Sequence, residues 1–312
     1  MLPATTTTPQ PYVLAFSELP DIKELLASQL SESSINMYRR DIAAYQSFAQ
    51  VHNADTMSAQ TLVNWRNHLA LNSTMSPNTI NRMLAAVKRI IKEAASNHMV
   101  DAATNLQFRN VDGVKTKALK TRLKQHSRTR ISPTDMRRLC ERPDTSTLVG
   151  VRDKALLAAM ASSGGRVSEI ATLTKEQIVK QDSGYVIQVC GKTDTEYRDA
   201  HLSIEAYQLI TKWLEIRPVE SHFIFTGFAG RGNRPQDTAM SETGIWKVVQ
   251  KYAEQCGLSY VKPHDFRRFV GTQLAKKDIR KAQTALGHKS IEVTARNYVL
   301  DTLEAGLTDD LY

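Results

Sequence analysis

The stretch PHDFRRFVGTQLAKKDIRKAQTALGHKSIEVTARNY, residues 263–298, is the part of this chain from which the rest can be interpreted. It carries four polar side chains of interest, His264, Arg267, His288 and Tyr298. The first two stand three positions apart, so they lie on one face of a helix. By itself the stretch fits a basic surface helix at least as well as a phosphate-binding face beside a nucleophile. The sequence upstream decides between these interpretations.

A second pattern of the same kind lies near the middle of the chain. Residues 148–161 are apolar enough for a helix, and the Ser-Ser-Gly-Gly run at 162–165 ends it. Arg166 then begins the next helix, where its charge opposes the helix dipole unless an anion binds there. Glu169, one turn later, can hold the guanidinium in place. The sequence therefore predicts an anion-binding arginine at this position.

The charge of the whole chain favours a polyanionic partner. The 312 residues carry a net charge of +9, with a pI near 9.4, and 41% of them are hydrophobic. This length suits two domains with real cores. The charge predicts a salt-sensitive attraction to nucleic acid, although charge alone also fits a merely soluble basic protein.

The cysteines and the apolar runs indicate a reducing, cytoplasmic setting. Cys140, Cys190 and Cys256 are odd in number and far apart, which argues against a disulfide framework or a zinc site. No run approaches the roughly 18 apolar residues of a membrane span, and we expect no membrane association. The sequence also lacks a Walker motif and an acidic cluster for Mg²⁺, so neither a metal nor another cofactor is expected.

The first third of the chain predicts a helical domain. Residues 1–16, rich in Thr and Pro, form a flexible arm, and residues 17–108 form the domain. Ser33 or Ser34 can cap one helix, Ser58 a second, and Ser76 a third that starts with proline at its first position. The apolar stripe of this third helix recurs at helical spacing in Ile80, Leu84, Val87, Ile91 and Ala94.

Basic residues of this domain and of the segment that follows are candidates for contact with DNA. On the helices they are Arg39, Arg40, Arg82, Lys88 and Arg89, which fit a solvated face as well as a surface lining a duplex. The segment 109–130 reads as a basic linker, with Lys115, Lys117, Lys120, Arg122 and Lys124. It fits a disordered tether, but so concentrated a charge favours a strap across phosphates.

The remaining residues, 131–312, predict a mixed domain. Ser132-Pro133 opens a helix, and residues 185–190 and 198–202 read as two strands joined by a turn that carries Lys192. Residues 204–214 and 243–256 read as helices, and residues 227–238 as a polar loop. The expected fold is mainly α, with a helical domain and an α+β domain around a small antiparallel sheet.

In order, these motifs resemble those of the tyrosine recombinase family, which includes the phage integrases and the Xer-like and Cre-like recombinases. The resemblance covers roughly residues 17–305. It rests on Gly164-Gly165-Arg166-Val167-Ser168-Glu169, Gly191-Lys192, His264-Asp265-Phe266-Arg267, Leu286-Gly287-His288 and Tyr298. Three features depart from the common pattern: Gly165 before the arginine, Arg268 after the second arginine, and a short interval up to His288 that lacks a glycine turn.

The resemblance implies a site-specific DNA recombinase that acts through a 3′-phosphotyrosine, for integration, excision or resolution, in some members within mobile elements. Two arginines bind the phosphate oxygens and stabilise the transition state, and Glu169 supports them. The implied catalytic set is Arg166, Lys192, His264, Arg267, His288 and Tyr298. Tyr298 is preferred to Tyr260 and Tyr312 because it stands ten residues after His288.

The family also implies how the protein meets DNA. The helical domain, residues 17–108, is similar to the family's SAM-like core-binding domain. The two domains form a clamp around double-stranded DNA with inverted-repeat core sites, and a homotetramer holds two such sites. Free protein is expected as a monomer or weak dimer, with its C-terminal tail packed either in cis or on a neighbour. Type IB topoisomerase activity and a non-catalytic DNA-binding regulator are the alternatives. The target sequence, the biological task and any accessory factors stay open.

Overall fold

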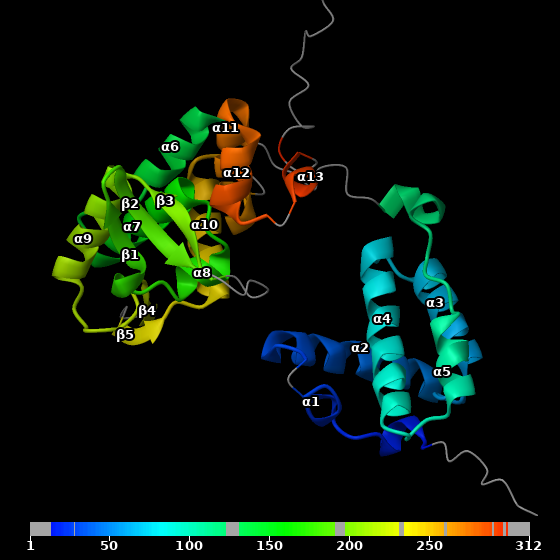
Figure 1. Ribbon diagram of the computed structural model, residues 1–312. Coiled ribbons are helices and arrows are strands. Elements are labelled where there is room, and N and C mark those ends of the chain that lie inside the picture. Colours follow the sequence, from blue (N-terminus) through cyan, green and yellow to red (C-terminus); the bar gives the residue numbers. More distant parts are fainter. Residues whose placement is uncertain are drawn as a thin grey trace, which may run out of the picture. The chain divides into compact units, whose positions relative to one another are not determined.

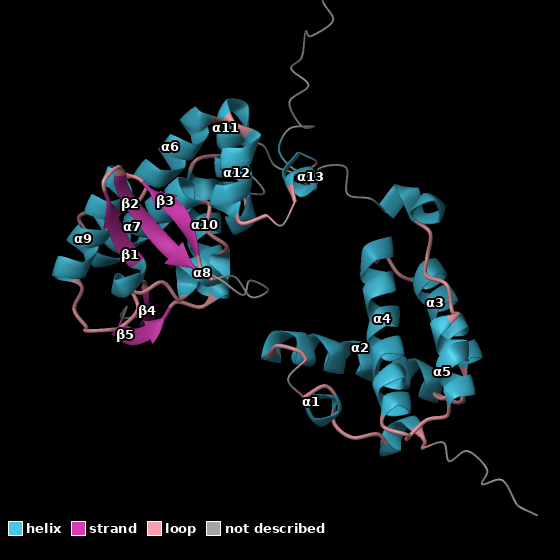
Figure 2. Ribbon diagram, viewed as in Figure 1, coloured by secondary structure: helices cyan, strands magenta, loops and turns pink. Residues whose placement is uncertain are grey.

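The structure divides into two units, each described by itself below. It is a computed structural model that describes residues 14–27, 29–122, 131–190, 197–230, 234–258, 261–288, 290–295 and 298. The contacts along the chain separate Met1–Gln125 from His126–Tyr312. Within the described residues, strands occur only in the second unit (Figures 1 and 2).

The first unit is built from helices. They are η1 (Phe16–Glu18), α1 (Ile22–Leu25), α2 (Glu32–Val51), α3 (Ala59–Asn72), α4 (Pro77–Ser96), α5 (Ala102–Arg109) and η2 (Thr116–Arg122). Ser76 caps α4 as predicted, because its hydroxyl accepts from the backbone N–H of Thr79 and proline follows it. The predicted cap of α2 was wrong, since Ser31 and not Ser33 or Ser34 accepts the first backbone bond.

Helix α4 is the centre of this unit. Its predicted apolar stripe is fully or almost fully buried, and α4 packs against α2, α3 and α5. Burying each of these aliphatic side chains contributes about 1.5–3 kcal/mol. The rings of Tyr45 on α2 and Trp65 on α3 lie 5.2 Å apart in the same core. The helical half of the predicted fold is therefore confirmed.

The segment after α5 is attached to this unit. Val111, Val114 and Leu119 pack against its core. Arg122 donates from Nη2 to the carbonyl of Ala70, at 2.6 Å, in the last turn of α3. Carbonyls at a helix end lack partners within the helix, so this bond supplies one. Residues 111–122 thus do not form the loose tether that low periodicity allowed, and Lys124 lies outside the described residues.

The second unit surrounds helix α7, which is apolar on most of its sides. Its helices are α6 (Pro133–Glu141), α7 (Leu148–Ser163), α8 (Val167–Ala171), η3 (Lys175–Gln177), α9 (Ile204–Ile216), α10 (Glu242–Gln255), α11 (Pro263–Lys277), α12 (Ile279–Leu286) and α13 (Ile291–Thr294). α7 contacts α6, α9 and α11, and residues such as Leu156, Leu157 and Met160 are fully buried. The C-terminal end of α7 is thereby held firmly where the candidate site begins.

Two antiparallel sheets complete the unit (Figure 2). The larger has the order β1 (Ile178–Gln181), β2 (Gly184–Val189) and β3 (Arg198–Leu202), with Val186 opposite His201. The predicted strands correspond to β2 and β3. The smaller sheet pairs β4 (Thr226–Ala229) with β5 (Arg234–Ala239), so the prediction of a polar loop over 227–238 was wrong. Most residues of β5 are exposed, so no alternation of apolar and polar residues marked it as a strand.

Candidate active site

The first arginine of the site lies where α7 ends. Gly164 takes up the left-handed conformation, with φ of 60°, that commonly closes a helix and that glycine adopts without strain. Arg166 is the residue immediately before α8. Its backbone N–H and its Nη1 each donate to the Glu169 carboxylate at 2.7 Å. The Glu169 side chain is only 1% exposed, so the contact expected from the spacing is present and well shielded.

The second arginine, Arg267 on α11, joins two helix ends that are distant in sequence. It is 3% exposed. Its Nη1 donates to the Gly164 carbonyl at 2.9 Å, and its Nη2 donates to the Leu286 carbonyl at the end of α12. Burial and the nearby charge of Arg198 lower the pKa of Arg267 to about 10, so the guanidinium stays charged at neutral pH.

The interval between Arg267 and His288 turns without the expected glycine. Asp278 ends α11 and also begins α12 in an extended conformation. Its backbone N–H donates to the Leu274 carbonyl, and its carboxylate accepts from the backbone N–H of Arg280, both at 2.8 Å. One aspartate thus performs both caps, which explains how the shorter interval still delivers His288 to the site.

His288 follows Gly287, the left-handed residue that ends α12 with φ of 62°. Its Nδ1 lies 2.9 Å from the Thr294 Oγ1 on α13, and Thr294 is fully buried. Burial, followed by the charges of Arg267 and Arg166, lowers the pKa of His288 to about 4. His288 is therefore neutral at physiological pH and can both accept and donate a hydrogen bond.

His264 is in the first turn of α11, one turn before Arg267, and its side chain is exposed to solvent. Desolvation by the neighbouring protein atoms and then the charges of Arg267 and Arg268 lower its pKa. The charge of His264 also acts on His288. The two histidines therefore share the electrostatic field of the arginines.

Tyr298 lies in the site formed by its own chain, and only 3% of its surface is exposed. Its ring is stacked on His288, with centroids 5.5 Å apart and planes 7° apart. A Cβ atom at Gly271 of α11 would come within 2.7 Å of the Tyr298 Cε1, so glycine provides the space for this ring. Burial raises the pKa of Tyr298, against the influence of Arg267, Arg268 and a hydrogen bond from the Arg267 guanidinium. The phenol thus lies directly beside an arginine.

Five of the six predicted catalytic residues therefore converge, whereas Lys192 lies outside the described residues, as do the rival tyrosines Tyr260 and Tyr312. Two residues of the site were missed. Arg198 at the start of β3 donates from Nη2 to Glu169 at 2.7 Å, and Thr294 binds His288. A buried threonine six positions after a histidine offers no local signal, and Arg198 meets Glu169 only through the fold.

The helical DNA-contact candidates have partners within the first unit. Arg82 pairs with the buried Asp41. Arg39 pairs with Asp21, with 2.7 Å from Nη2 to Oδ1. Such pairs arise between residues far apart in sequence, so a helical pattern cannot separate them from a face turned to solvent.

The remaining candidates fall into two groups. Lys88 donates to the Val111 carbonyl, Arg89 pairs with Glu93 at 3.1 Å, and Arg40 donates to the Asn36 carbonyl at 3.3 Å. By contrast, the side chains of three lysines in and before η2 are exposed. They are Lys115, Lys117 and Lys120.

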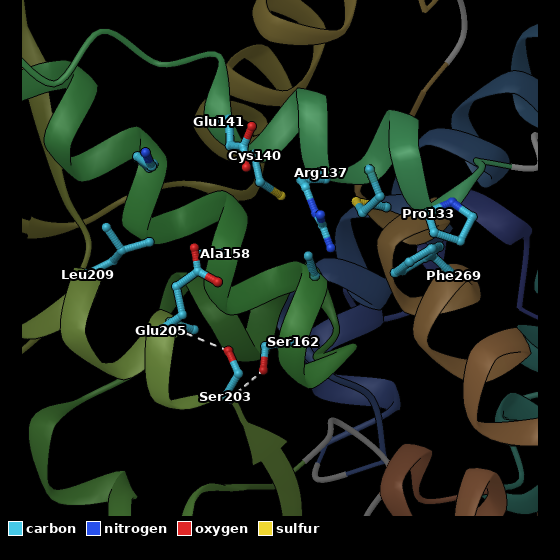
Figure 3. Close-up of a pocket in the computed structure, with 14 residues that line it drawn as sticks. Pro133, Arg137, Cys140, Glu141, Ala158, Ser162, Ser203, Glu205, Leu209 and Phe269 are labelled. Carbon is cyan, nitrogen blue, oxygen red and sulfur yellow. Dashed lines mark hydrogen bonds between the residues drawn. The ribbon is translucent and has the colours of Figure 1, made fainter. Parts of the chain in front are cut away.

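One pocket of the second unit lies away from this chemistry. It has a volume of about 610 Å³ and is lined by α6, α7, α9 and Phe269 of α11 (Figure 3). At one side the backbone N–H of Ser203 donates to the Ser162 hydroxyl at 2.6 Å. None of the converging arginines, histidines or Tyr298 lines it. The site is instead made by helix ends, which suits a large polymeric substrate better than an enclosed small molecule.

The described residues contain neither a metal-binding cluster nor a membrane-spanning helix. Within those residues no group of three or more His, Cys, Asp or Glu side chains could hold a metal ion. Over the same part of the chain, none of the helices has the length and apolar character needed to cross a bilayer.

Comparison with known proteins assigns the chain to a family. Residues 129–304 match the phage integrase family, which is more than half of the chain. The chain belongs to the phage integrase family. A second match, over residues 23–98, is to the N-terminal SAM-like domain of phage integrases. As a tyrosine recombinase of this family, the chain catalyses DNA cleavage and rejoining in site-specific recombination.

Two relatives agree with the phage integrase assignment. The tyrosine recombinase XerD of Listeria innocua is 26% identical over 285 residues, covering 85% of this chain and 87% of that protein. XerD of Neisseria meningitidis serogroup B is 33% identical over 173 residues, covering 53% of this chain and 56% of that protein.

Two solved structures show the same fold. A lambda integrase(75–356) dimer bound to a COC′ core site has a TM-score of 0.64 at 15% identity, covering 90% of this chain and 94% of that one. The XerH site-specific recombinase bound to palindromic difH substrate, a post-cleavage complex, has a TM-score of 0.62 at 22% identity. It covers 86% of this chain and 77% of that one. The mainly helical fold with small antiparallel sheets is thereby confirmed for this integrase.

Proposed function

We propose that this recombinase cuts DNA by attack of the Tyr298 hydroxyl on a phosphodiester and rejoins it through a 3′-phosphotyrosine. The observation that carries the proposal is the position of the Tyr298 phenol, which is buried beside Arg267 and stacked on the neutral His288. Attack forms the bond between the phenol oxygen and phosphorus, and the 5′-oxygen of the next nucleotide leaves. The new ester keeps the energy of the broken one, so the reverse attack rejoins the strand without ATP.

Arg166 and Arg267 bind the phosphate. Both guanidiniums are anchored through part of their donors, Arg166 by Glu169 and Arg267 by two backbone carbonyls. A guanidinium presents its N–H donors in a planar fork that matches two phosphate oxygens. Negative charge grows on these oxygens as the tyrosine attacks, and fixed cations stabilise that state more than the ground state.

The two histidines have separate roles. His264, exposed at the start of α11, assists removal of the phenol proton, because burial raises the pKa of Tyr298 and disfavours spontaneous ionisation. His288 donates a hydrogen bond from Nε2 to a phosphoryl oxygen. That role requires the proton on Nε2, and a Thr294 hydroxyl that donates to Nδ1 selects this tautomer.

The role of Thr294 predicts an effect of its removal. Thr294→Val keeps the buried shape but loses the hydroxyl, so the two tautomers of His288 become more nearly equal in population. We expect single-turnover cleavage to slow by about 10-fold, the effect of a modest loss of transition-state stabilisation. Thr211→Val is the control, because its hydroxyl bonds to the Tyr207 carbonyl away from the site. Equal rates in Thr294→Val and wild type would exclude tautomer control by this residue.

Lys192 is proposed as the general acid that protonates the departing 5′-oxygen. We expect Lys192→Ala to lose cleavage of ordinary DNA but to recover on a substrate with a bridging 5′-sulfur, because a thiolate leaves without proton assistance. Arg267→Ala should recover much less, since it lacks charge stabilisation. Equal defects of Lys192→Ala on the two substrates, in a cleavage assay, would leave His264 or His288 as the acid.

The assembly proposed is a clamp of the two units around double-stranded DNA. Inverted-repeat core sites and a homotetramer on two such sites complete it, with a monomer or weak dimer in free solution. The lambda integrase dimer on a core site and XerH on a palindromic substrate support the part of this proposal that concerns binding to DNA core sites. The phosphate-contact candidates best placed are the exposed Lys115, Lys117 and Lys120. Six other candidates would have to exchange internal partners for phosphate, namely Arg39, Arg40, Arg82, Lys88, Arg89 and Arg122. Three separated cysteines suit a cytoplasmic enzyme.

The test of the function uses a suicide DNA substrate, nicked so that the cleaved end diffuses away. The substrate carries a candidate site taken from inverted repeats beside the gene. We expect a covalent protein–DNA product that resists SDS and forms in EDTA without ATP. Binding without this product would indicate a non-catalytic DNA-binding regulator. Relaxation of a supercoiled plasmid that lacks the site would indicate a topoisomerase instead.

A further inference from the structure

Arg198 connects three parts of the candidate site. It is the first residue of β3, and its side chain is 11% exposed. Its Nη2 donates to Glu169 Oε2, and its Nη1 donates to the Ala285 carbonyl in α12, both at 2.7 Å. Glu169 uses its other oxygen, Oε1, for Arg166. Arg198 therefore links the sheet both to the partner of Arg166 and to the helix that precedes His288.

The side chain of Arg198 also packs closely against the backbone of Gly287. A Cβ atom at Gly287 would lie 2.4 Å from the Arg198 Cδ and 2.8 Å from its Nε. Gly287 is thus required twice, for its left-handed φ and for this close approach. The backbone turn that carries His288 rests on the stem of Arg198.

The same end of α12 is held by two guanidiniums. Arg198 binds the Ala285 carbonyl, and Arg267 binds the neighbouring Leu286 carbonyl. These carbonyls belong to the last turn of the helix, where intrahelical partners are missing and cations are favoured. The two bonds fix the direction in which the chain leaves α12 toward His288.

We propose that Arg198 is a positioning residue for strand cleavage, which holds Arg166 through Glu169 and His288 through the turn at Gly287. This inference rests on the function proposed above. Arg198 acts through these groups because both of its Nη atoms are committed to protein acceptors, and its buried Nε has no hydrogen-bond partner among the described residues. It brings a third positive charge close to Arg267, and the Glu169 carboxylate between Arg166 and Arg198 offsets part of that repulsion.

Geometry as well as charge is required for this role. The Glu169 oxygen and the Ala285 carbonyl are bound by different nitrogens of one planar group. A lysine keeps the charge but has a single nitrogen on a flexible stem, so it lacks the fork that spans both acceptors. Arg198→Lys should therefore loosen the site while leaving its net charge unchanged.

The experiment compares Arg198→Lys and Arg198→Gln with Arg217→Lys. Arg217 is the matched control, since it also donates from both Nη atoms, to the carbonyls of Phe223 and Ser221, but outside the site. Single-turnover cleavage of the suicide substrate, DNA affinity and thermal unfolding are measured for each. Assays run well below every unfolding midpoint.

We expect both Arg198 variants to cleave about 10- to 100-fold more slowly, the scale of a displacement near 1 Å in an active site. DNA affinity should change by less than about threefold, because other cations supply the phosphate contacts. Arg217→Lys should unfold at a similarly lowered temperature and cleave at the wild-type rate. A wild-type rate in Arg198→Lys would show that charge alone matters and would overturn the inference.

A double-mutant cycle with Glu169→Gln tests the route of the effect. Because Arg198 acts both through Glu169 and through the turn at Gly287, the double variant Glu169→Gln/Arg198→Lys should be slower than the slower single variant but clearly faster than the product of the two single effects. Multiplied effects would show independent action and overturn the inference. An inactive wild type would instead refute the proposed function, so the two failures are distinguishable.

Discussion

Tyr298→Phe is expected to bind its DNA site with unchanged affinity and to form no covalent adduct at all. Phenylalanine keeps the ring that stacks on His288 and packs against Gly271, so the site should remain folded. Only the hydroxyl that becomes the phosphotyrosine is lost, and with it the nucleophile of the proposed mechanism. The suicide substrate followed by denaturing electrophoresis measures the adduct directly, and a mobility-shift titration measures affinity.

The control for this variant is Tyr207→Phe. Tyr207 belongs to the same unit and lies outside the site, where its ring is stacked on Tyr185 with 3.7 Å between the ring centroids. Tyr207→Phe removes a hydroxyl there and should form as much covalent adduct as the wild type. If the adduct survived in Tyr298→Phe and vanished in Tyr312→Phe, the nucleophile would be the terminal tyrosine, and the mechanism proposed here would need a different arrangement of the chain's end.

Arg267→Ala should reduce cleavage by at least about 10³-fold, at the upper end of what one lost transition-state donor costs. Two effects contribute. Arg267 is proposed to bind the phosphate, and it also bridges the carbonyls of Gly164 and Leu286. Loss of this bridge leaves two backbone carbonyls with fewer partners, at a cost of about 1–3 kcal/mol in stability. Arg166→Ala should be similarly inactive. DNA affinity of both variants should stay within about tenfold of wild type.

Arg267→Lys separates charge from geometry. Lysine is a point charge without the fork, so it cannot bridge both carbonyls and also bind two phosphate oxygens. We expect a poor rescue, with cleavage still at least about 10²-fold below wild type. Single-turnover rates and thermal unfolding should be measured together, with Arg217→Lys as the variant that loses comparable carbonyl bonds elsewhere. Near-normal cleavage by Arg267→Lys would contradict a bidentate role.

Local patterns were enough for the features that depend on neighbours in sequence. The cap of α4 at Ser76 and its buried stripe follow from hydrogen bonding and helical period alone. The contact of Arg166 with Glu169 likewise needs only one helical turn. The order of the motifs was sufficient to indicate a tyrosine recombinase, and the family match agrees.

Features of the site that depend on distant residues were not predictable in this way. Arg198 meets Glu169 across 29 positions, and Arg267 meets Gly164 across 103. No periodic pattern in the sequence predicts either contact, because each arises only when helix ends and a strand are packed around α7. The partners of the basic residues in the first unit were likewise not predictable from local sequence. Arg82 pairs with Asp41, which is 41 positions away and buried.

The sequence by itself therefore indicated the family and its chemistry, since it contains the arginines, the histidines and the tyrosine in the order of the tyrosine recombinase motifs. The tertiary structure alone decided how these groups are held. Local spacing controls which side chains share a helical face, whereas the partners of a buried guanidinium depend on which backbone carbonyls lack a bond after packing. In this chain those carbonyls lie at the ends of α7 and α12, and the fold brings Arg198 and Arg267 to them.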